Sequence, residues 1–167
     1  MRSVKVVVRG VSIALATCLI GAFALVSAQS NAAVVGTWKM NSAKSKYVPG
    51  PAPKSLTITY EATANGFTAM NQGVDNEGKP INPDKNKVNI IFDGKDHPTQ
   101  TTNTVYNTSS WKRIDANSWT ATRKKDGKTT QTVKTVVSAD GKTLTITTSG
   151  VNAEGQTINN KVVYDKQ

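Results

Sequence analysis

The residues of this chain that could take part in chemistry are few and lie apart in the sequence. His97 is the only histidine and Asp96 precedes it, a pair that a general base or a metal site can use near neutral pH. Glu61 and Asp165 lie on expected strands, and a catalytic carboxylate pair needs a separation of about 5–10 Å. Arg123 carries a planar guanidinium that binds carboxylate or phosphate through parallel hydrogen bonds. These positions are the starting points for any reactive or binding site.

The surroundings of these residues argue against catalysis. One histidine and one cysteine do not make a metal shell, and the acidic residues lie mainly in turns, where Asp is favoured for its backbone geometry. The sequence has neither a nucleophile-elbow serine nor a glycine-rich phosphate loop. We therefore predict a protein that is not an enzyme and has no catalytic residue, metal or cofactor. A small hydrolase built on a carboxylate pair is the alternative.

The N-terminus has the three parts of a secretory signal. Arg2, Lys5 and Arg9 form a basic leader, residues 11–26 form an uncharged and mostly apolar run, and small residues precede a cleavage point after Ala28. The apolar run is short for a membrane span, which takes about 20 residues. We therefore predict export, and a periplasmic or secreted protein.

Cleavage at this point defines residues 1–28 as a signal peptide and residues 29–167 as one domain, large enough for a single core. A cut after Ala32 and an uncleaved membrane anchor are alternatives. Lipidation at Cys18 is disfavoured, because the apolar run continues where a lipoprotein would begin a polar tether. The predicted domain contains no cysteine, so it has to be stabilised by packing alone.

The predicted domain is basic, with 18 Lys and Arg against 11 Asp and Glu. Sixteen of the 18 cations are lysines spread among Thr and Asn. Binding to nucleic acid usually requires clustered cations with stacking aromatics, so we predict no nucleic-acid partner. Scattered lysines discourage aggregation of sheet edges and allow weak association with anionic envelope surfaces. We predict a monomer.

Alternating strands and regular turns predict an all-β protein. Leu56, Ile58 and Tyr60 alternate with polar residues, as do Leu144 and Ile146, and this period of two places one strand face on a core. Turn residues recur at 64–66, 75–78, 93–94, 115–117, 126–127, 140–141 and 152–155. We predict an antiparallel up-and-down meander of about 8–10 strands that closes into a β-barrel, with a sandwich as the alternative.

Two features depart from this rhythm. Residues 41–55 contain three prolines, which exclude a regular helix and predict an extended crossover. This crossover is either a cover over one mouth of the barrel or a simple connector. Residues 73–82 match residues 150–159 at six of ten positions. The match indicates one turn type used twice, or else a duplicated half-barrel.

The turns between residues 111 and 146 allow two registers, and a slip of one residue would reverse the face of a whole strand. In the first register, Arg123 and Lys112 share the inner face with seven apolar residues: Ile114, Trp119, Ala121, Val133, Val137, Leu144 and Ile146. In the second register, Trp111 and Arg113 point inward instead. The first register places Arg123 near the rim, where it could clamp an anionic group. The alternative for Arg123 is a solvated surface position.

The beginning of the first strand resembles the opening motif of lipocalins and their calycin relatives, in which Gly36 and Trp38 are separated by one residue. In that group the tryptophan closes the base of the barrel and a basic side chain near the last strand packs over it. The resemblance assigns this basic role to Lys161. The later Thr-Asp-Tyr motif of lipocalins and the Arg-x-Tyr clamp of fatty-acid-binding proteins are absent. The resemblance therefore implies a lipocalin-like barrel but not a lipid ligand.

A longer resemblance covers residues 36–53, which are similar to uncharacterised exported bacterial proteins described as lipocalin-like. It implies a fold and a compartment but no activity. We predict that the barrel binds a small hydrophobic or anionic ligand, with Tyr60, Phe92 and Trp119 as aromatic lining and Arg123 as polar anchor. The alternative is a fully packed envelope-associated module that uses its basic surface or the proline-rich segment.

Overall fold

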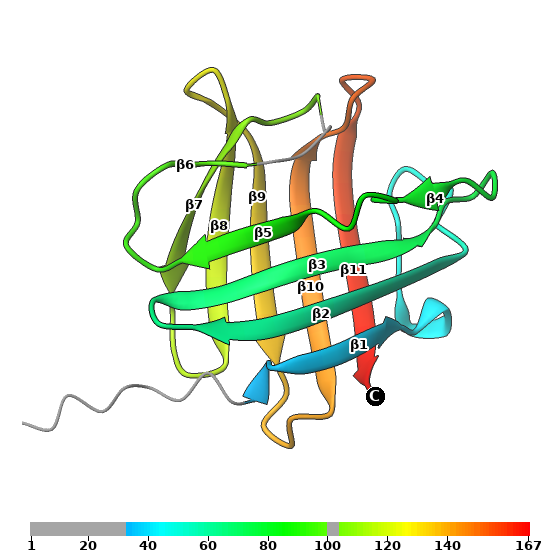
Figure 1. Ribbon diagram of the computed structural model, residues 1–167. Coiled ribbons are helices and arrows are strands. Elements are labelled where there is room, and N and C mark those ends of the chain that lie inside the picture. Colours follow the sequence, from blue (N-terminus) through cyan, green and yellow to red (C-terminus); the bar gives the residue numbers. More distant parts are fainter. Residues whose placement is uncertain (1–32, 100–103) are drawn as a thin grey trace, which may run out of the picture.

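The computed structural model describes residues 33–99 and 104–167, which form one antiparallel sheet of eleven strands (Figure 1). The strand order is β4-β3-β2-β1-β11-β10-β9-β8-β7-β6, and β5 pairs with the same edge of β3 as β4. The strands are β1 (Gly36–Met40), β2 (Ser55–Thr63), β3 (Gly66–Val74), β4 (Pro80–Ile81), β5 (Lys87–Ile91), β6 (His97–Pro98), β7 (Thr108–Arg113), β8 (Ser118–Lys125), β9 (Lys128–Val137), β10 (Thr143–Val151) and β11 (Thr157–Lys166). The predicted all-β meander is confirmed, while the predicted signal peptide lies outside the described residues. None of the helices described in the chain has the length and apolarity to cross a bilayer.

The sheet curls strongly into a half-barrel. β1 pairs with both β2 and β11, so the first strand joins the two parts of the sheet that cross in Figure 1. In the described chain no ladder joins β5 to β6 or β7, although the Gly94 N–H donates to the Trp111 carbonyl at 3.2 Å. The sheet is therefore one curled up-and-down meander and not the pair of separate sheets of a sandwich, and one seam has no strand ladder.

The registers of β8, β9 and β10 follow the first of the two predicted alternatives. Trp119 pairs with Thr135, and Ala121 pairs with Val133. All four side chains are buried, as the alternation of apolar residues requires. The predicted inner face is thus confirmed for these strands.

β7 follows the second alternative. Trp111 pairs with Ala121 and is 5% exposed, whereas Lys112 is exposed and Ile114 is 55% exposed. The prediction that Lys112 and Ile114 point inward is therefore wrong. Burying the indole of Trp111 removes more apolar surface from water than burying Ile114, and it leaves the Lys112 amine solvated.

Trp38 holds the base of the half-barrel, and its side chain is completely buried. Its indole Nε1–H donates a hydrogen bond to the Val34 carbonyl at 2.7 Å. The Lys166 amine lies 5.2 Å from the centroid of the indole ring and donates to the Ala33 carbonyl at 2.9 Å. The basic partner of the tryptophan is therefore Lys166, which pairs directly with Trp38 across β1 and β11. The expectation for Lys161 is wrong, because that side chain is exposed.

Residues 41–55, which we call the strap, run beside β11. A short 3₁₀ turn, Ser42–Lys44, interrupts the chain after β1. Lys46 then forms a β-bridge with Lys161, and the Val48 carbonyl accepts a hydrogen bond from the β11 backbone at 2.9 Å. The predicted crossover is confirmed, and it gives β11 a second backbone neighbour beyond the end of β1.

The two similar segments of the sequence form the same turn. The Asp75 N–H donates to the Lys79 carbonyl at 2.9 Å, and the Asn152 N–H donates to the Gln156 carbonyl at 3.0 Å. In both turns the Oδ1 of the first residue accepts the N–H of the fifth at 2.8 Å. The prediction of one turn type used twice is confirmed.

Replacing Trp38 by Ala should lower the free energy of unfolding by about 3–5 kcal/mol, because a buried indole is lost and a cavity is left behind. Urea denaturation followed by circular dichroism measures this loss. Ile114→Ala, at the 55% exposed position, is the control and should change stability by less than about 0.5 kcal/mol. A loss below about 1 kcal/mol for Trp38→Ala would contradict a structural role for the ring.

Candidate functional site

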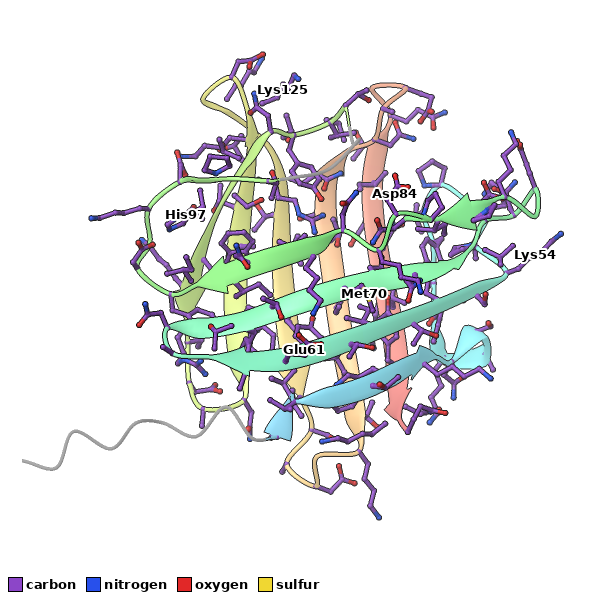
Figure 2. All side chains as sticks on the ribbon, in the orientation of Figure 1. Lys54, Glu61, Met70, Asp84, His97 and Lys125 are labelled. Atoms are coloured by element: carbon purple, nitrogen blue, oxygen red, sulfur yellow. The ribbon has the colours of Figure 1, made fainter. Side chains whose placement is uncertain are left out.

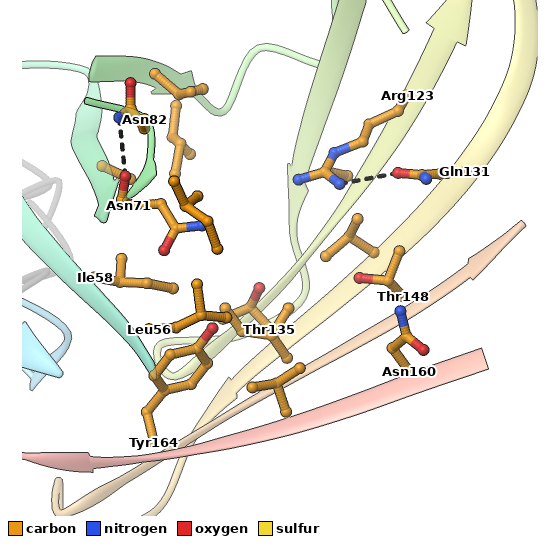
Figure 3. A pocket seen from close by; sticks show the side chains of 18 of the residues that line it. Leu56, Ile58, Asn71, Asn82, Arg123, Gln131, Thr135, Thr148, Asn160 and Tyr164 are labelled. Atoms are coloured by element: carbon orange, nitrogen blue, oxygen red, sulfur yellow. Dashed lines mark hydrogen bonds between the residues drawn. The ribbon is translucent and has the colours of Figure 1, made fainter. Parts of the chain in front are cut away.

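A cavity of about 670 Å³ lies inside the curled sheet, between strands β2–β5 and strands β7–β11. Its apolar lining consists of Pro53, Leu56, Ile58, Ala69, Ile81, Val88, Ile90, Trp111, Trp119, Ala121, Val133, Ile146, Ile158 and Val162. Figure 3 shows Leu56 and Ile58 on one side of the cavity and Thr148 and Asn160 on the other. Side chains therefore do not fill the interior, contrary to the fully packed alternative.

Four tyrosines line this cavity: Tyr47 from the strap, Tyr60 from β2, Tyr106 from the loop before β7 and Tyr164 from β11. Burial raises the pKa of Tyr47 to about 12, and burial also raises the pKa of Tyr60 and of Tyr164. Repulsion from ionised Tyr47 and Tyr60 raises the pKa of Tyr164 further. The hydroxyls of Tyr47, Tyr60 and Tyr164 are therefore neutral near pH 7 and can donate, and that of Tyr47 donates to the Met40 Sδ at 3.6 Å.

A polar cluster around Arg123 occupies another part of the cavity wall. The Arg123 Nη1–H donates to the Gln131 Oε1 at 3.0 Å (Figure 3), and the guanidinium lies 4.5 Å from the Tyr106 ring centroid. Gln131 in turn donates to the Val151 carbonyl at 2.8 Å. The guanidinium makes no other hydrogen bond to the described residues, so these contacts fix its position and leave N–H donors for an anion.

Asn82 organises the opposite wall, in the loop between β4 and β5. Its Nδ2–H group donates to the Asn71 carbonyl at 2.9 Å and to the Asn86 carbonyl at 3.0 Å. Its Oδ1 accepts the Asn86 N–H at 3.0 Å. Figure 3 shows Asn82 and Asn71 across the cavity from Arg123. The oxygen and the nitrogen of the Asn82 amide are thus both hydrogen-bonded within the protein. These bonds hold the loop between β4 and β5 in the shape of this wall.

Three of the four predicted ligand-binding residues line the cavity: Tyr60, Trp119 and Arg123. Phe92 lies outside that lining. Its ring packs against Trp119, with centroids 6.1 Å apart, and the Arg113 guanidinium lies 4.2 Å from its centroid. Contact of these residues with a ligand stays a prediction.

Gly36 and Trp38, the predicted structural residues, lie at the base of the half-barrel and outside the cavity lining. Gly36 has a φ of +123°, a conformation that L-residues rarely adopt. This backbone conformation accounts for glycine at the first position of β1.

Sequence reasoning missed Tyr164, Gln131 and Tyr47 as cavity residues. Tyr164 and Gln131 share the faces of Val162 and Val133, so the period of two along β11 and β9 was a sufficient signal for both. Tyr47 belongs to the strap. Its inward direction depends on the pairing of the strap with β11, which has no signal in the local sequence.

His97 forms a structural contact at the start of β6. Its Nε2 lies 2.9 Å from the Asp93 Oδ1, and Asp93 also accepts the Lys95 N–H at 2.9 Å. The neighbouring Asp96 instead pairs with Lys124 at 2.7 Å. His97 therefore belongs to a turn that is stabilised by hydrogen bonds (Figure 2).

Glu61 and Asp165 do not form a carboxylate pair. The Glu61 Oε2 accepts from Lys87 at 2.6 Å, and the Asp165 Oδ2 accepts from Asn41 at 2.7 Å. β1 lies between the two strands that carry them. Within the described part of the chain, no group of three His, Cys, Asp or Glu residues could hold a metal ion.

Two solved structures are similar to this fold over most of the chain. The zebrafish ileal bile acid-binding protein complexed with cholic acid matches with a TM-score of 0.53 and 13% sequence identity, over 81% of this chain and 99% of that chain. As-p18, an extracellular fatty acid binding protein, matches with a TM-score of 0.54 and 13% identity, over 81% of this chain and 96% of that chain. The chain has a calycin-type fold.

At 13% identity this similarity establishes the fold alone. No family model matches the chain, and no curated protein matches its sequence. The predicted calycin resemblance is therefore confirmed at the level of the fold.

The Asp93–His97 contact should make stability depend on pH. The hydrogen bond from His97, assisted by the Lys95 N–H, lowers the pKa of Asp93 below its ordinary value of 3.8. A carboxyl whose pKa is lowered by folding stabilises the protein above its ordinary pKa, and this stabilisation is lost as the pH falls through the lowered value. Asp93→Asn should therefore be less stable than the wild type at neutral pH and should lose less stability below about pH 4.

Thermal melts between neutral and strongly acidic pH measure this difference. His97→Phe removes the largest cause of the Asp93 shift and should flatten the acid dependence in the same direction. Wild-type acid dependence in both variants would show that the contact does not contribute.

Proposed function

We propose that this protein binds a small, partly apolar molecule inside the half-barrel and does not transform it chemically. The observation that supports this most is the internal cavity of about 670 Å³, because small-molecule sites commonly have volumes of about 300–1,000 Å³. Its walls combine apolar side chains with polar groups at fixed places, and these polar groups can orient a ligand. The two similar structures are named as a bile acid-binding and a fatty acid binding protein, which supports a ligand with a hydrophobic body.

The proposed ligand carries an anionic group that pairs with Arg123. Arg123 is half-buried and is the one cation among the described residues that line the cavity. Gln131 and the Tyr106 ring hold its guanidinium in place. A planar guanidinium forms two parallel hydrogen bonds with a carboxylate, and partial removal of water strengthens the pairing.

We propose that the protein acts outside the cytoplasm, as a monomer. The basic leader and the apolar run before Ala28 support export.

A second candidate function, weak association with anionic phospholipid surfaces, is supported by a row of lysines on the outer face of the sheet. Successive cross-strand pairs give the row Lys112, Thr120, Lys134, Thr147, Lys161 and Lys46. The four lysines are exposed, and none forms a salt bridge with another described residue. Since adjacent strands lie about 4.8 Å apart, the lysine positions follow one another at about 5–10 Å. A row with this spacing presents several cations to one surface at the same time.

Val133→Trp should block the cavity, because Val133 is 6% exposed on the inner face of β9. We expect wild-type protein to bind the anionic dye 1-anilinonaphthalene-8-sulfonate, and the variant to bind it at least about tenfold more weakly, as measured by fluorescence titration. Val136→Trp is the matched control, since Val136 lies on the same strand and is 37% exposed on the outer face. Equal binding by the two folded variants, or none by the wild type, would refute the cavity as the binding site.

Removing the lysine row should weaken binding to phosphatidylglycerol vesicles at least about tenfold at low salt, since each lysine near such a surface contributes about 1 kcal/mol. The row variant replaces Lys112, Lys134 and Lys161 by Gln. The charge-matched control replaces three other exposed lysines by Gln: Lys54, Lys85 and Lys128. Vesicle co-sedimentation measures both, and an equal loss in the two variants would show that net charge alone is responsible.

A further inference from the structure

The cavity contains two buried phenol oxygens that have no hydrogen-bond partner. Tyr60 is 4% exposed and Tyr164 is 3% exposed, and neither hydroxyl is paired with any described residue. Both oxygens remain in contact with the open space of the cavity, unlike the Ser109 hydroxyl, which is unpaired and sealed in the protein. Figure 3 shows the Tyr164 hydroxyl directed from β11 into the cavity. A molecule in the cavity therefore has access to both phenols.

Thr135 adds a third oxygen to this part of the wall. Its side chain is 4% exposed, lines the cavity from β9, and has no hydrogen bond to another residue of the described chain. Like the two phenol hydroxyls, its hydroxyl still contacts the cavity space. We call Tyr60, Thr135 and Tyr164 the hydroxyl cluster.

The hydroxyl cluster is poorly suited to a purely hydrocarbon ligand. Buried polar groups in folded proteins almost always have a hydrogen-bond partner, and covering one without giving it a partner is costly. A hydrocarbon chain in the cavity would exclude water from the cluster and would offer the hydroxyls no hydrogen-bond partner in its place. A ligand oxygen at the same place would accept the phenol protons and satisfy the buried groups.

Thr135 and Tyr164 lie at a distance from the Arg123 end of the cavity, whereas Tyr60 is near enough for the Arg123 charge to oppose the rise that burial causes in its pKa. Gln131, the partner of Arg123, precedes Thr135 by four residues on β9, which corresponds to about 13 Å along an extended strand. Figure 3 shows Arg123 and Tyr164 at opposite corners of the cavity. Between these ends lie the apolar residues Ala121, Val133 and Ile146, while Thr148 and Asn160 add polar groups to the wall beside Val133. The cavity thus offers two polar ends, and the wall between them gives an apolar ligand body contact with Ala121, Val133 and Ile146.

We propose that the ligand is an acid with a second oxygen at its far end, that is, a hydroxy or oxo acid with an apolar body of about ten carbons. Its carboxylate pairs with Arg123, and its distal hydroxyl or carbonyl oxygen forms hydrogen bonds with the hydroxyl cluster, chiefly with Tyr60 and Tyr164. This assignment rests on the proposed binding function. It goes further in that it names the group that the deep part of the cavity recognises.

Decanoic acid and its ω-hydroxy derivative test the assignment as a pair that differs by one oxygen. Each acid displaces 1-anilinonaphthalene-8-sulfonate from the wild-type protein, and the dissociation constants are compared. We expect the hydroxy acid to bind about 3- to 10-fold more tightly, the effect of one to two additional neutral hydrogen bonds. Tyr164→Phe and Tyr60→Phe should reduce this preference, and the double variant should abolish it.

Thr135→Val and Thr145→Val form a matched control pair, since both remove one hydroxyl at nearly constant volume. Thr135 faces the cavity, whereas Thr145 lies on the outer face of β10 and is absent from the lining. Only Thr135→Val should diminish the preference, and circular dichroism establishes that each variant is folded. Equal affinities for the two acids in the wild type, or a preference that survives the double tyrosine variant, would overturn the assignment and leave cavity binding intact. If Val133→Trp prevents dye binding but neither acid displaces the dye from the wild type, the assignment is also overturned. If Val133→Trp leaves dye binding unchanged, the proposed function itself is overturned.

Discussion

The contact between Trp38 and Lys166 is the interaction on which the remaining structure depends. β1 is the strand that joins the two parts of the curled sheet, and Trp38 fixes β1 through its buried ring, its hydrogen bond to Val34 and the amine of Lys166 above it. The same amine donates a hydrogen bond to the Ala33 carbonyl, which fixes the chain just before β1 against the base. Without this contact, only the backbone ladders of β1 with β2 and β11 would join the two walls of the cavity at the base.

The interior of the half-barrel has a tightly packed aromatic end and an open cavity beside it. At one end, the rings of Tyr60, Phe67, Phe92 and Trp119 meet mostly edge to face, with centroids 5.6–6.2 Å apart, a favourable arrangement for aromatic pairs. Beyond them, the inward residues of β8–β10 become smaller or polar, as at Ala121, Val133 and Thr148, and the cavity begins. Tyr60 belongs to both regions, since its ring packs in the aromatic group while its hydroxyl remains available. A packed ring therefore positions an unpaired donor without the flexibility of a loop.

Local patterns were sufficient to predict much of this fold, but not its long-range contacts. Period-two alternation placed Trp119, Ala121 and Val133 on the inner face, and turn residues located the hairpins. The pattern failed at β7, where both faces contain an aromatic or aliphatic residue and a cation, so that only packing against β8 and β5 distinguishes Trp111 from Ile114. The sequence motif suggested a basic partner for Trp38, yet the choice of Lys166 over Lys161 depends on the register between the first and last strands. The same holds for the cavity residues. Arg123 was predicted from the face of its strand, whereas the position of Tyr47 depends on the path of the strap, which local patterns do not reveal.

The position of β1 between β2 and β11 also has a consequence for the order of folding. Hairpins β7–β8, β8–β9, β9–β10 and β10–β11 pair strands that are adjacent in the chain, and such local contacts form early and fast. The contact that closes the base joins residues separated by 133 positions. Forming it therefore costs the conformational entropy of closing a long loop. We therefore expect the hairpin array to assemble first and the first strand to dock late, when the last strand is already in place. The first strand of the sheet in sequence order, β1, is therefore expected to be the last to join it during folding.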